Sequence, residues 1–532
     1  MNATVGGPRP TIPAIAAGAA DQFGGRLAIE SGETRLTYAE LFDEARSFGA
    51  ALVAAGIEPG DRVAIWAFNS AEWVVALLGL SLAGAVLVPI NTRFKGGEAA
   101  DILTRSRARA LVTVTDFLDT DYVAMLGATG IEHPDLTTII VASGPVPAGA
   151  ESWEGFMAGA SDANRRIVDQ RCSELGADDP SDILFTSGTT GVPKGVVMTH
   201  GRTLCVATDW VEMTGLCTED RYLMVNPYFH MFGLKAGILA CVASGATMLP
   251  ESVFDVDRIL KRVDREQVTV LPGPPTLYQA ILDHPNRAGH RLSTLRVAVT
   301  GAADIPVELV RRIHDELPFS IVVTGYGLTE AGTAAATSAG DDVETIATTV
   351  GRPRPGFELR IVGEDGDAAP GEPGEVVLRG GSVMTGYLDD PEATELALSS
   401  DGWLRTGDLG VIDDAGCLRI VGRMKDMFIV GGFNAYPAEI ENLLLRHPDI
   451  QHAAVIGIPD DRLGEVGMAF VVTGSGTGSA SDIVDWCREH MANYKVPRVV
   501  EIVDELPVNA TGKVMKDTLR QRAMDRRAEP AT

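Results

Sequence analysis

A ten-residue stretch rich in glycine and hydroxyl side chains is the feature that most restricts how this chain can fold. Residues 186–195 read Thr-Ser-Gly-Thr-Thr-Gly-Val-Pro-Lys-Gly and directly follow the mostly apolar run 182–185. The apolar run predicts a buried strand, and the glycines and hydroxyls after it would let backbone and side-chain donors approach an anion closely. Because Lys194 is followed by Gly195, the stretch lacks the hydroxyl that binds Mg²⁺ in a GxxxxGK[ST] loop. We therefore predict a phosphate-binding loop of another kind, with an ordinary surface turn as the alternative.

Length and charge limit the possible partners. A chain of 532 residues is too long for one core and predicts three or four domain-sized units. Its formal net charge of −27 disfavours nucleic acid or an anionic membrane as a partner, and an anionic ligand would need a locally basic pocket. The six cysteines form no CxxC pair, which favours free thiols in a reducing compartment and a cytoplasmic location.

The run from Trp73 to Ile90 is uncharged and on length alone could cross a membrane. It contains two glycines, a serine and Pro89. We interpret it as a buried helix to Ala83, a turn at Gly84 and then a strand. Residues 1–10 lack the charged and apolar segments of a signal peptide. We therefore expect no integral membrane span.

The pattern of elements predicts an α/β fold. Helical patterns alternate with short strands through residue 115 and again after the glycine-rich stretch, which is typical of two βαβ-type lobes. Residues 143–180 are rich in Gly, Asp and Pro and are interpreted as a linker. From about residue 350, short strands and Gly/Pro turns predict a small distorted β-barrel. Helical and strand patterns then alternate in a small α+β C-terminal part.

Four further short motifs carry polar groups suited to a nucleotide. They are Tyr326-Gly327-Leu328-Thr329-Glu330, Thr406-Gly407-Asp408, Gly422-Arg423-Met424-Lys425-Asp426 and Asn509-Ala510-Thr511-Gly512-Lys513. Taken singly, each could be an ordinary turn or helix start. Together with residues 187–195 they resemble, in order and spacing, the signatures of the adenylate-forming (ANL) superfamily: acyl-CoA synthetases, peptide-synthetase adenylation domains and beetle luciferase. The resemblance covers roughly residues 10–527.

This resemblance implies an ATP site and its chemistry. Tyr326 would stack on adenine, Asp408 would accept the ribose hydroxyls, and Glu330 would supply a hard oxygen ligand to Mg²⁺. The implied ATP- or AMP-binding residues are Thr186, Ser187, Gly188, Thr189, Thr190, Lys194, Gly301, Ala302, Ala303, Tyr326, Gly327, Thr329, Asp408 and Arg423. The implied catalytic residues are Lys513, Thr329, Glu330 and His230.

The resemblance also implies two domains that move. A large AMP-binding domain of residues 1–424 would be joined at the hinge residue Lys425 to a small mobile domain of residues 425–532. Gly431, Gly432 and Asn434 would line the channel for coenzyme A.

The acid is suggested by the residues of the implied acyl pocket, His230, Lys235 and Gly332. The aromatic turn 228–232 contains no acidic residue, which disfavours an amino acid. Lys235 lies in an apolar stretch, so its amine either reaches solvent or meets a polar group of the substrate. The small side chains of residues 331–336 would leave room for a bulky medium-chain, aryl or alicyclic acid.

We therefore predict an ATP-dependent carboxylic acid–CoA ligase that forms an acyl-adenylate and then a thioester with CoA. An enzyme that loads a carrier protein and a non-catalytic nucleotide-binding homologue are the alternatives. Monomer and homodimer both remain open.

Overall fold

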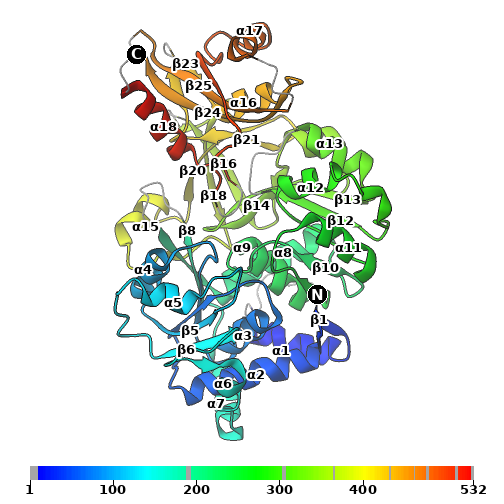
Figure 1. Ribbon diagram of the computed structural model, residues 1–532, viewed down its shortest axis with the longest axis vertical. Coiled ribbons are helices and arrows are strands. Elements are labelled where there is room, and N and C mark those ends of the chain that lie inside the picture. The colour runs from blue at the N-terminus through cyan, green and yellow to red at the C-terminus, as the bar shows by residue number, and fades with distance from the viewer. Residues whose placement is uncertain are drawn as a thin grey trace.

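The computed structural model describes residues 10–186, 193–301, 307–363, 366–430, 433–460, 462–474, 479–509 and 513–528. Its chain forms a large α/β body and a smaller α+β unit, which lies at the top of Figure 1 in orange and red. The predicted α/β fold with two units of unequal size is confirmed.

An eight-stranded sheet organises the first lobe, and its core strands run parallel (Figure 1). The strand order is β19-β9-β8-β4-β3-β5-β6-β7. The strands are β3 (Arg62–Trp66), β4 (Val86–Pro89), β5 (Ala108–Val114), β6 (Thr138–Ser143), β7 (Glu151–Ser152), β8 (Pro180–Thr186), β9 (Lys194–Thr199) and β19 (Gly386–Tyr387). β8, β9 and β19 form antiparallel pairs at one edge, so the strand after the glycine-rich stretch, β9, lies beside a segment about 190 residues further along the sequence.

Helices cover this sheet. They are α1 (Ile12–Phe23), α2 (Tyr38–Ala54), α3 (Ala71–Leu82), α4 (Gly96–Ser106), α5 (Tyr122–Gly127), α6 (Trp153–Met157) and α7 (Asp162–Glu174). The uncharged run 73–90 folds as predicted: α3 ends beside Ala83, Gly84 adopts a φ of 80°, and β4 follows. Among the residues that the structure describes, no helix combines the length and apolar character needed to cross a bilayer.

The prediction that residues 143–180 form a linker is wrong, because this range contains β7, α6 and α7. α7 is polar, with only Val168 and Arg171 buried, so it has no apolar stripe from which a helix could be predicted. Instead, Arg171 donates to the Ile57 carbonyl at 2.7 Å and pairs with Glu58 at 2.7 Å. Tertiary hydrogen bonds therefore fix this helix.

The second lobe contains two four-stranded sheets, ordered β10-β11-β1-β2 and β12-β13-β14-β15. The strands are β1 (Leu27–Ser31), β2 (Thr34–Thr37), β10 (Arg221–Met224), β11 (Thr247–Pro250), β12 (Val297–Gly301), β13 (Ile321–Leu328), β14 (Gly332–Ala336) and β15 (Arg352–Pro353). The helices are α8 (His200–Thr214), α9 (Met231–Gly233), the π-helix η1 (Leu234–Leu239), α10 (Ala240–Ser244), α11 (Val256–Glu266), α12 (Pro275–Leu282), the 3₁₀-helix η2 (Arg287–Gly289), α13 (Val307–Glu316) and α14 (Val343–Thr348).

The region predicted as a distorted barrel forms a five-stranded antiparallel sheet, ordered β17-β16-β18-β20-β21. Its strands are β16 (Phe357–Gly363), β17 (Gly366–Asp367), β18 (Gly374–Gly380), β20 (Leu404–Ile412) and β21 (Leu418–Arg423), and α15 (Pro391–Ala397) precedes β20. This sheet lies between the lobes and the smaller unit (Figure 1).

The smaller unit has its own sheet, ordered β23-β22-β25-β24, with β26 paired in parallel to β25. Its elements are β22 (Phe428–Val430), β23 (Phe433–Ala435), α16 (Pro437–Leu444), β24 (Ile450–Asp460), β25 (Gly464–Thr473), α17 (Ala480–His490), β26 (Val499–Ile502) and α18 (Lys516–Ala528). β21 and β22 belong to different sheets and are joined by the turn 424–427.

Candidate active site

The two ends of the glycine-rich stretch lie on the paired antiparallel strands β8 and β9, here called the phosphate hairpin. Thr186 at the end of β8 pairs with Lys194 at the start of β9, and the Thr186 Oγ1 donates to the Lys194 carbonyl at 3.5 Å. Ser187, Gly188, Thr189 and Thr190 lie outside the described residues. The structure thus provides the rigid base of the predicted phosphate loop and places Lys194 on it.

Tyr326, Asp408 and Arg423 come together from three strands. The Tyr326 hydroxyl donates to Asp408 Oδ2 at 2.6 Å, and Arg423 Nε lies 2.8 Å from Asp408 Oδ1. β20 and β21 bring the last two into direct register. Asp408 is buried, and burial together with this carboxylate raises the pKa of Tyr326 well above its ordinary value. Three of the predicted nucleotide-binding residues therefore form one hydrogen-bonded cluster.

Glycines let the backbones approach closely beside this cluster. A Cβ on Gly301 would lie 2.9 Å from the Gly325 carbonyl oxygen, and one on Gly327 would lie 2.4 Å from that of Gly332. Larger residues at either position would push the strands apart. Ala302 and Ala303 lie outside the described residues.

Glu330 lies with Thr329 in the turn between β13 and β14. Its Oε1 accepts a hydrogen bond from the Tyr387 hydroxyl at 3.0 Å. Burial raises the pKa of Glu330 above its ordinary value, so the carboxylate gains from a nearby positive charge. Lys194 Nζ lies 5.0 Å from the centroid of the Tyr387 ring. Tyr387 was missed in the sequence, and only the pairing of β19 with β9 reveals it.

His230 begins the short helix α9 as its N-cap. Its Nδ1 accepts from the Phe232 N–H at 3.2 Å, and desolvation lowers its pKa from 6.5 to about 4, so the ring is neutral at pH 7. Gly233 is required here, because a Cβ would lie 2.2 Å from the Pro227 carbonyl oxygen. The turn is therefore tightly built and presents a neutral imidazole.

Lys235 is fully buried in η1, and its Nζ lies 2.8 Å from Asp182 Oδ1 on β8. The interpretation that its amine reaches solvent is wrong. Asp182 also accepts hydrogen bonds from the Ser181 and Thr203 hydroxyls. Burial lowers the pKa of Lys235, and the carboxylate opposes that shift. The lysine thus has a protein partner in the core, and this pair connects the turn after His230 to the strand that leads to the phosphate hairpin.

Gly332 begins β14 with a φ of 77°, and a Cβ there would lie 2.5 Å from Val206 Cγ2 of α8. Trp210, one turn further along α8, packs edge-on against Phe232 with ring centroids 5.1 Å apart. α8, α9 and β14 therefore border one region, as the acyl-pocket prediction requires. A larger residue at Gly332 would strain the backbone and collide with Val206, whether or not an acid lies nearby.

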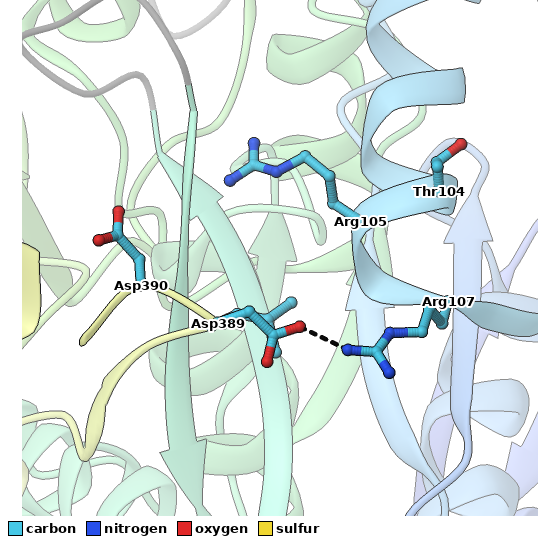
Figure 2. Close-up of a pocket in the computed structure, with 6 residues that line it drawn as sticks. Thr104, Arg105, Arg107, Asp389 and Asp390 are labelled. Carbon is cyan, nitrogen blue, oxygen red and sulfur yellow. Dashed lines mark hydrogen bonds and ion pairs between the residues drawn. The ribbon is translucent and has the colours of Figure 1, made fainter. Parts of the chain in front are cut away.

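A polar pocket of about 360 Å³ lies beside the base of the hairpin (Figure 2). Arg107 at the end of α4 pairs with Asp389 at 2.7 Å across this pocket. Arg105 donates to the Pro193 carbonyl at 2.6 Å, and its guanidinium carbon lies 5.2 Å from the Phe185 ring centroid. These contacts brace the hairpin from the side of the first lobe.

The C-terminal site residues are placed in part. Lys425 is exposed in the turn 424–427. Lys513 is exposed before α18, where its N–H donates to Asn509 Oδ1 at 2.9 Å and its carbonyl accepts from the Asn509 N–H at 2.8 Å. The backbone of Asn434 pairs with that of Ile429. Gly431 and Gly432 lie outside the described residues.

Comparisons with known proteins match nearly the whole chain. The model of the AMP-binding enzyme family matches residues 17–388, and that of the AMP-binding enzyme C-terminal domain matches residues 439–513. A relative in Rhodococcus jostii (strain RHA1), 3-[(3aS,4S,7aS)-7a-methyl-1,5-dioxo-octahydro-1H-inden-4-yl]propanoyl:CoA ligase, is 47% identical over 96% of this chain and 98% of its own length. A ligase of the same name in Mycobacterium tuberculosis (strain ATCC 25618 / H37Rv) is 49% identical, again over 96% and 98%.

A solved structure is similar throughout. The anthranilate CoA ligase AuaEII in complex with anthranoyl-AMP has a TM-score of 0.88 and 28% identity, covering 99% of this chain and 100% of that one.

Proposed function

The chain belongs to the family of AMP-binding enzymes, and from that premise we propose that its substrate is a fused-ring alicyclic propanoic acid. The enzyme is an AMP-forming acid–CoA ligase that uses ATP and CoA. The proposed acid rests on two relatives that are 47% and 49% identical over 96% of this chain. Both are named as ligases of the same fused-ring propanoic acid. The aromatic turn at residues 228–232, which holds no acidic residue, also suits an acid without an ammonium group.

In the first step a carboxylate oxygen of the acid bonds to the α-phosphorus of ATP, and pyrophosphate leaves. We assign the ribose hydroxyls to Asp408 and Arg423 and the adenine ring to Tyr326, because these three side chains already form one cluster. Thr329, in the turn beside Glu330, is assigned as a donor to the α-phosphate. Lys194 and Lys513 would stabilise the negative charge that gathers during this step.

The residues present fit a magnesium ion. Glu330 is a carboxylate whose pKa is raised by burial, so a cation would stabilise its charged form. Among the described residues no group of three acidic, His or Cys side chains could hold a metal alone. This fits an ion that takes one or two carboxylates and completes its shell with phosphates and water. When bound, Mg²⁺ would neutralise charge on the phosphates of ATP.

In the second step the thiol of CoA loses its proton, its sulfur bonds to the acyl carbon, and AMP leaves. We propose that the small domain of residues 425–532 turns about Lys425 relative to residues 1–424 for this step. Lys425 suits a hinge because it is exposed in a turn between two separate sheets. The channel for CoA is assigned to Gly431, Gly432 and Asn434.

We further propose a cytoplasmic location, which is supported by the lack of any disulfide bond among the described residues. Tyr326, Asp408, Arg423, Glu330 and Tyr387 come from one chain. A homodimer stays part of the proposal, and the oligomeric state in solution tests it.

The proposed acid is tested with a panel read by AMP release in the presence of ATP, Mg²⁺ and CoA. The panel contains a fused bicyclic propanoate with ring carbonyls, the same bicycle without the carbonyls, ferulate, indoleacetate and octanoate. We expect the bicyclic propanoates to have kcat/KM values at least about tenfold above the others, the size of effect that pocket contacts supply. An aryl or straight-chain acid of equal or higher kcat/KM would refute the proposed acid and leave the ligase class intact.

A further inference from the structure

Tyr387 contacts two residues assigned to the adenylation step, although no motif marks it. Its hydroxyl donates to Glu330 Oε1 at 3.0 Å. A hydrogen bond to one carboxylate oxygen is a strong, charge-assisted contact that restricts the orientations open to the whole carboxylate. The rotamer of Glu330 is therefore restricted from β19, a strand more than fifty residues further along the chain.

The face of the same ring lies against Lys194. The Nζ is 5.0 Å from the ring centroid, within the range in which an ammonium is attracted to an aromatic face. One side chain thus touches both the cation on the phosphate hairpin and the carboxylate opposite it.

The backbone that carries Tyr387 is firmly held. Tyr387 pairs with Val196 in the β19–β9 ladder, and its N–H donates to Thr394 Oγ1 at 2.9 Å. The next N–H, of Leu388, donates to the Gly195 carbonyl at 2.7 Å. Beyond it, Asp389 pairs with Arg107 across the pocket shown in Figure 2. The same segment is also tied to the turn that carries Glu330, because the Met384 N–H donates to the Glu330 carbonyl at 2.7 Å. β19 therefore connects the base of the hairpin to that turn.

We propose that Tyr387 is a positioning residue that holds the Glu330 carboxylate and the Lys194 ammonium in register around the phosphates of ATP. The two contacts can be removed separately by mutation, because the hydroxyl contacts Glu330 and the ring face contacts Lys194. The proposal rests on the proposed role of Glu330 toward Mg²⁺. The experiment below can refute the role of Tyr387 without refuting that of Glu330.

The test measures ATP binding by calorimetry during a Mg²⁺ titration, without acid or CoA. Tyr387→Phe removes only the hydroxyl. We expect the Mg²⁺ concentration for half-maximal ATP binding to rise about tenfold, the effect of losing one hydrogen bond to a charged group. ATP affinity at saturating Mg²⁺ should stay close to wild type. Tyr387→Leu removes the ring as well, and should also weaken ATP binding at saturating Mg²⁺.

Two variants serve as controls. Tyr122→Phe deletes a hydroxyl that donates to the Thr92 carbonyl at 2.7 Å in the first lobe, and it should leave the Mg²⁺ titration unchanged. Glu330→Gln should shift the titration at least as far as Tyr387→Phe. Conversion of supplied acyl-adenylate to thioester should stay normal in Tyr387→Phe, because that step uses neither Mg²⁺ nor pyrophosphate.

An unchanged Mg²⁺ titration in Tyr387→Phe, with Glu330→Gln shifted, would overturn the positioning role and spare the assignment of Glu330. An unchanged titration in both variants would overturn both assignments. Equal shifts in Tyr387→Phe and Tyr122→Phe would mean that general loss of stability explains the effect, which also refutes the proposal.

Discussion

At the scale of single residues, burial determines which polar partners a side chain in this site must have. Asp408 is 4% exposed and holds both the Tyr326 hydroxyl and Arg423. By contrast, Asp413 lies exposed in the turn that joins β20 to β21, and its Oδ1 accepts hydrogen bonds from the Ala415 and Cys417 N–H groups of that turn. Asp408 and Asp413 are the same residue type five positions apart. Burial places Asp408 in the candidate site, whereas exposure leaves Asp413 as a turn residue.

The first prediction uses this contrast. Asp408→Asn keeps the shape of the side chain and removes its charge, so the contact with Arg423 and the proposed hydrogen bonds to ribose should weaken. If Asp408 binds the ribose as proposed, we expect the KM for ATP to rise about tenfold or more, while the KM for the acid changes less than about twofold. Steady-state kinetics with each substrate varied in turn provide the measurement.

Asp413→Asn is the matched control, because it is the same substitution in a turn of the same sheet, and it should leave both KM values near wild type. If Asp408→Asn raises the two KM values equally, Asp408 has a structural role and does not bind ribose.

At the scale of elements, the buried pair Lys235–Asp182 ties the π-helix η1 to β8. Both charges are almost completely removed from water, with side chains 0% and 2% exposed. Desolvation makes an unpaired charge at such a site costly, whereas the matched pair is tolerated. The pair therefore fixes how the turn at His230 sits against the strand that leads to the phosphate hairpin.

The second prediction concerns this pair. Lys235→Met should destabilise the protein by about 3–5 kcal/mol, because it leaves Asp182 charged and buried without its partner. Adding Asp182→Asn should recover most of this loss, since the amide can still bond the Ser181 and Thr203 hydroxyls. Urea unfolding of the single and double variants measures both effects.

An exposed pair provides the comparison. Arg488→Met on α17 breaks a surface contact with Asp485, and the two side chains of this pair are 56% and 67% exposed. This change should cost less than about 1 kcal/mol. A cost for Lys235→Met no greater than for Arg488→Met would contradict the buried-pair explanation.

At the scale of the whole molecule, two bodies with separate sheets are joined by one short turn. The large body ends its last sheet at β21, and the smaller unit begins at β22. Arg520 of α18 pairs with Asp426 at 2.6 Å, so the helix that follows Lys513 is attached just after Lys425. Rotation at Lys425 would thus carry Lys513 and α18 together.

The third prediction separates the two half-reactions. Lys513→Ala should slow pyrophosphate exchange by about 10²–10³, the effect of losing one preorganised donor, and should spare the conversion of supplied acyl-adenylate to thioester. Lys425→Pro stiffens the turn and should impair the second step more than the first. Both half-reactions are measured on both variants.

Lys261→Ala removes an exposed lysine of α11 and should alter neither step. If Lys513→Ala and Lys425→Pro damage the two steps in the same proportion, one fixed arrangement serves both reactions and the hinge at Lys425 is refuted.

Features formed by residues close together in the sequence could be predicted from the sequence alone. An apolar run followed by glycines and hydroxyls predicted the strand that leads into the loop, and the motif spacing identified the family. The motifs also singled out Tyr326, Asp408 and Arg423 one by one, but only the folded chain shows that their side chains contact one another.

Only the tertiary structure decided which distant groups meet. The sequence shows no reason for Tyr387 to reach Glu330, because the contact depends on β19 pairing with β9 across 190 residues. It suggested solvent or substrate as a partner for Lys235, whereas the fold places Asp182 beside it. It also missed α7, whose helix is held by Arg171 rather than by an apolar stripe. In each case the deciding energy is that of burying and pairing a polar group, which depends on neighbours that only the folded chain supplies.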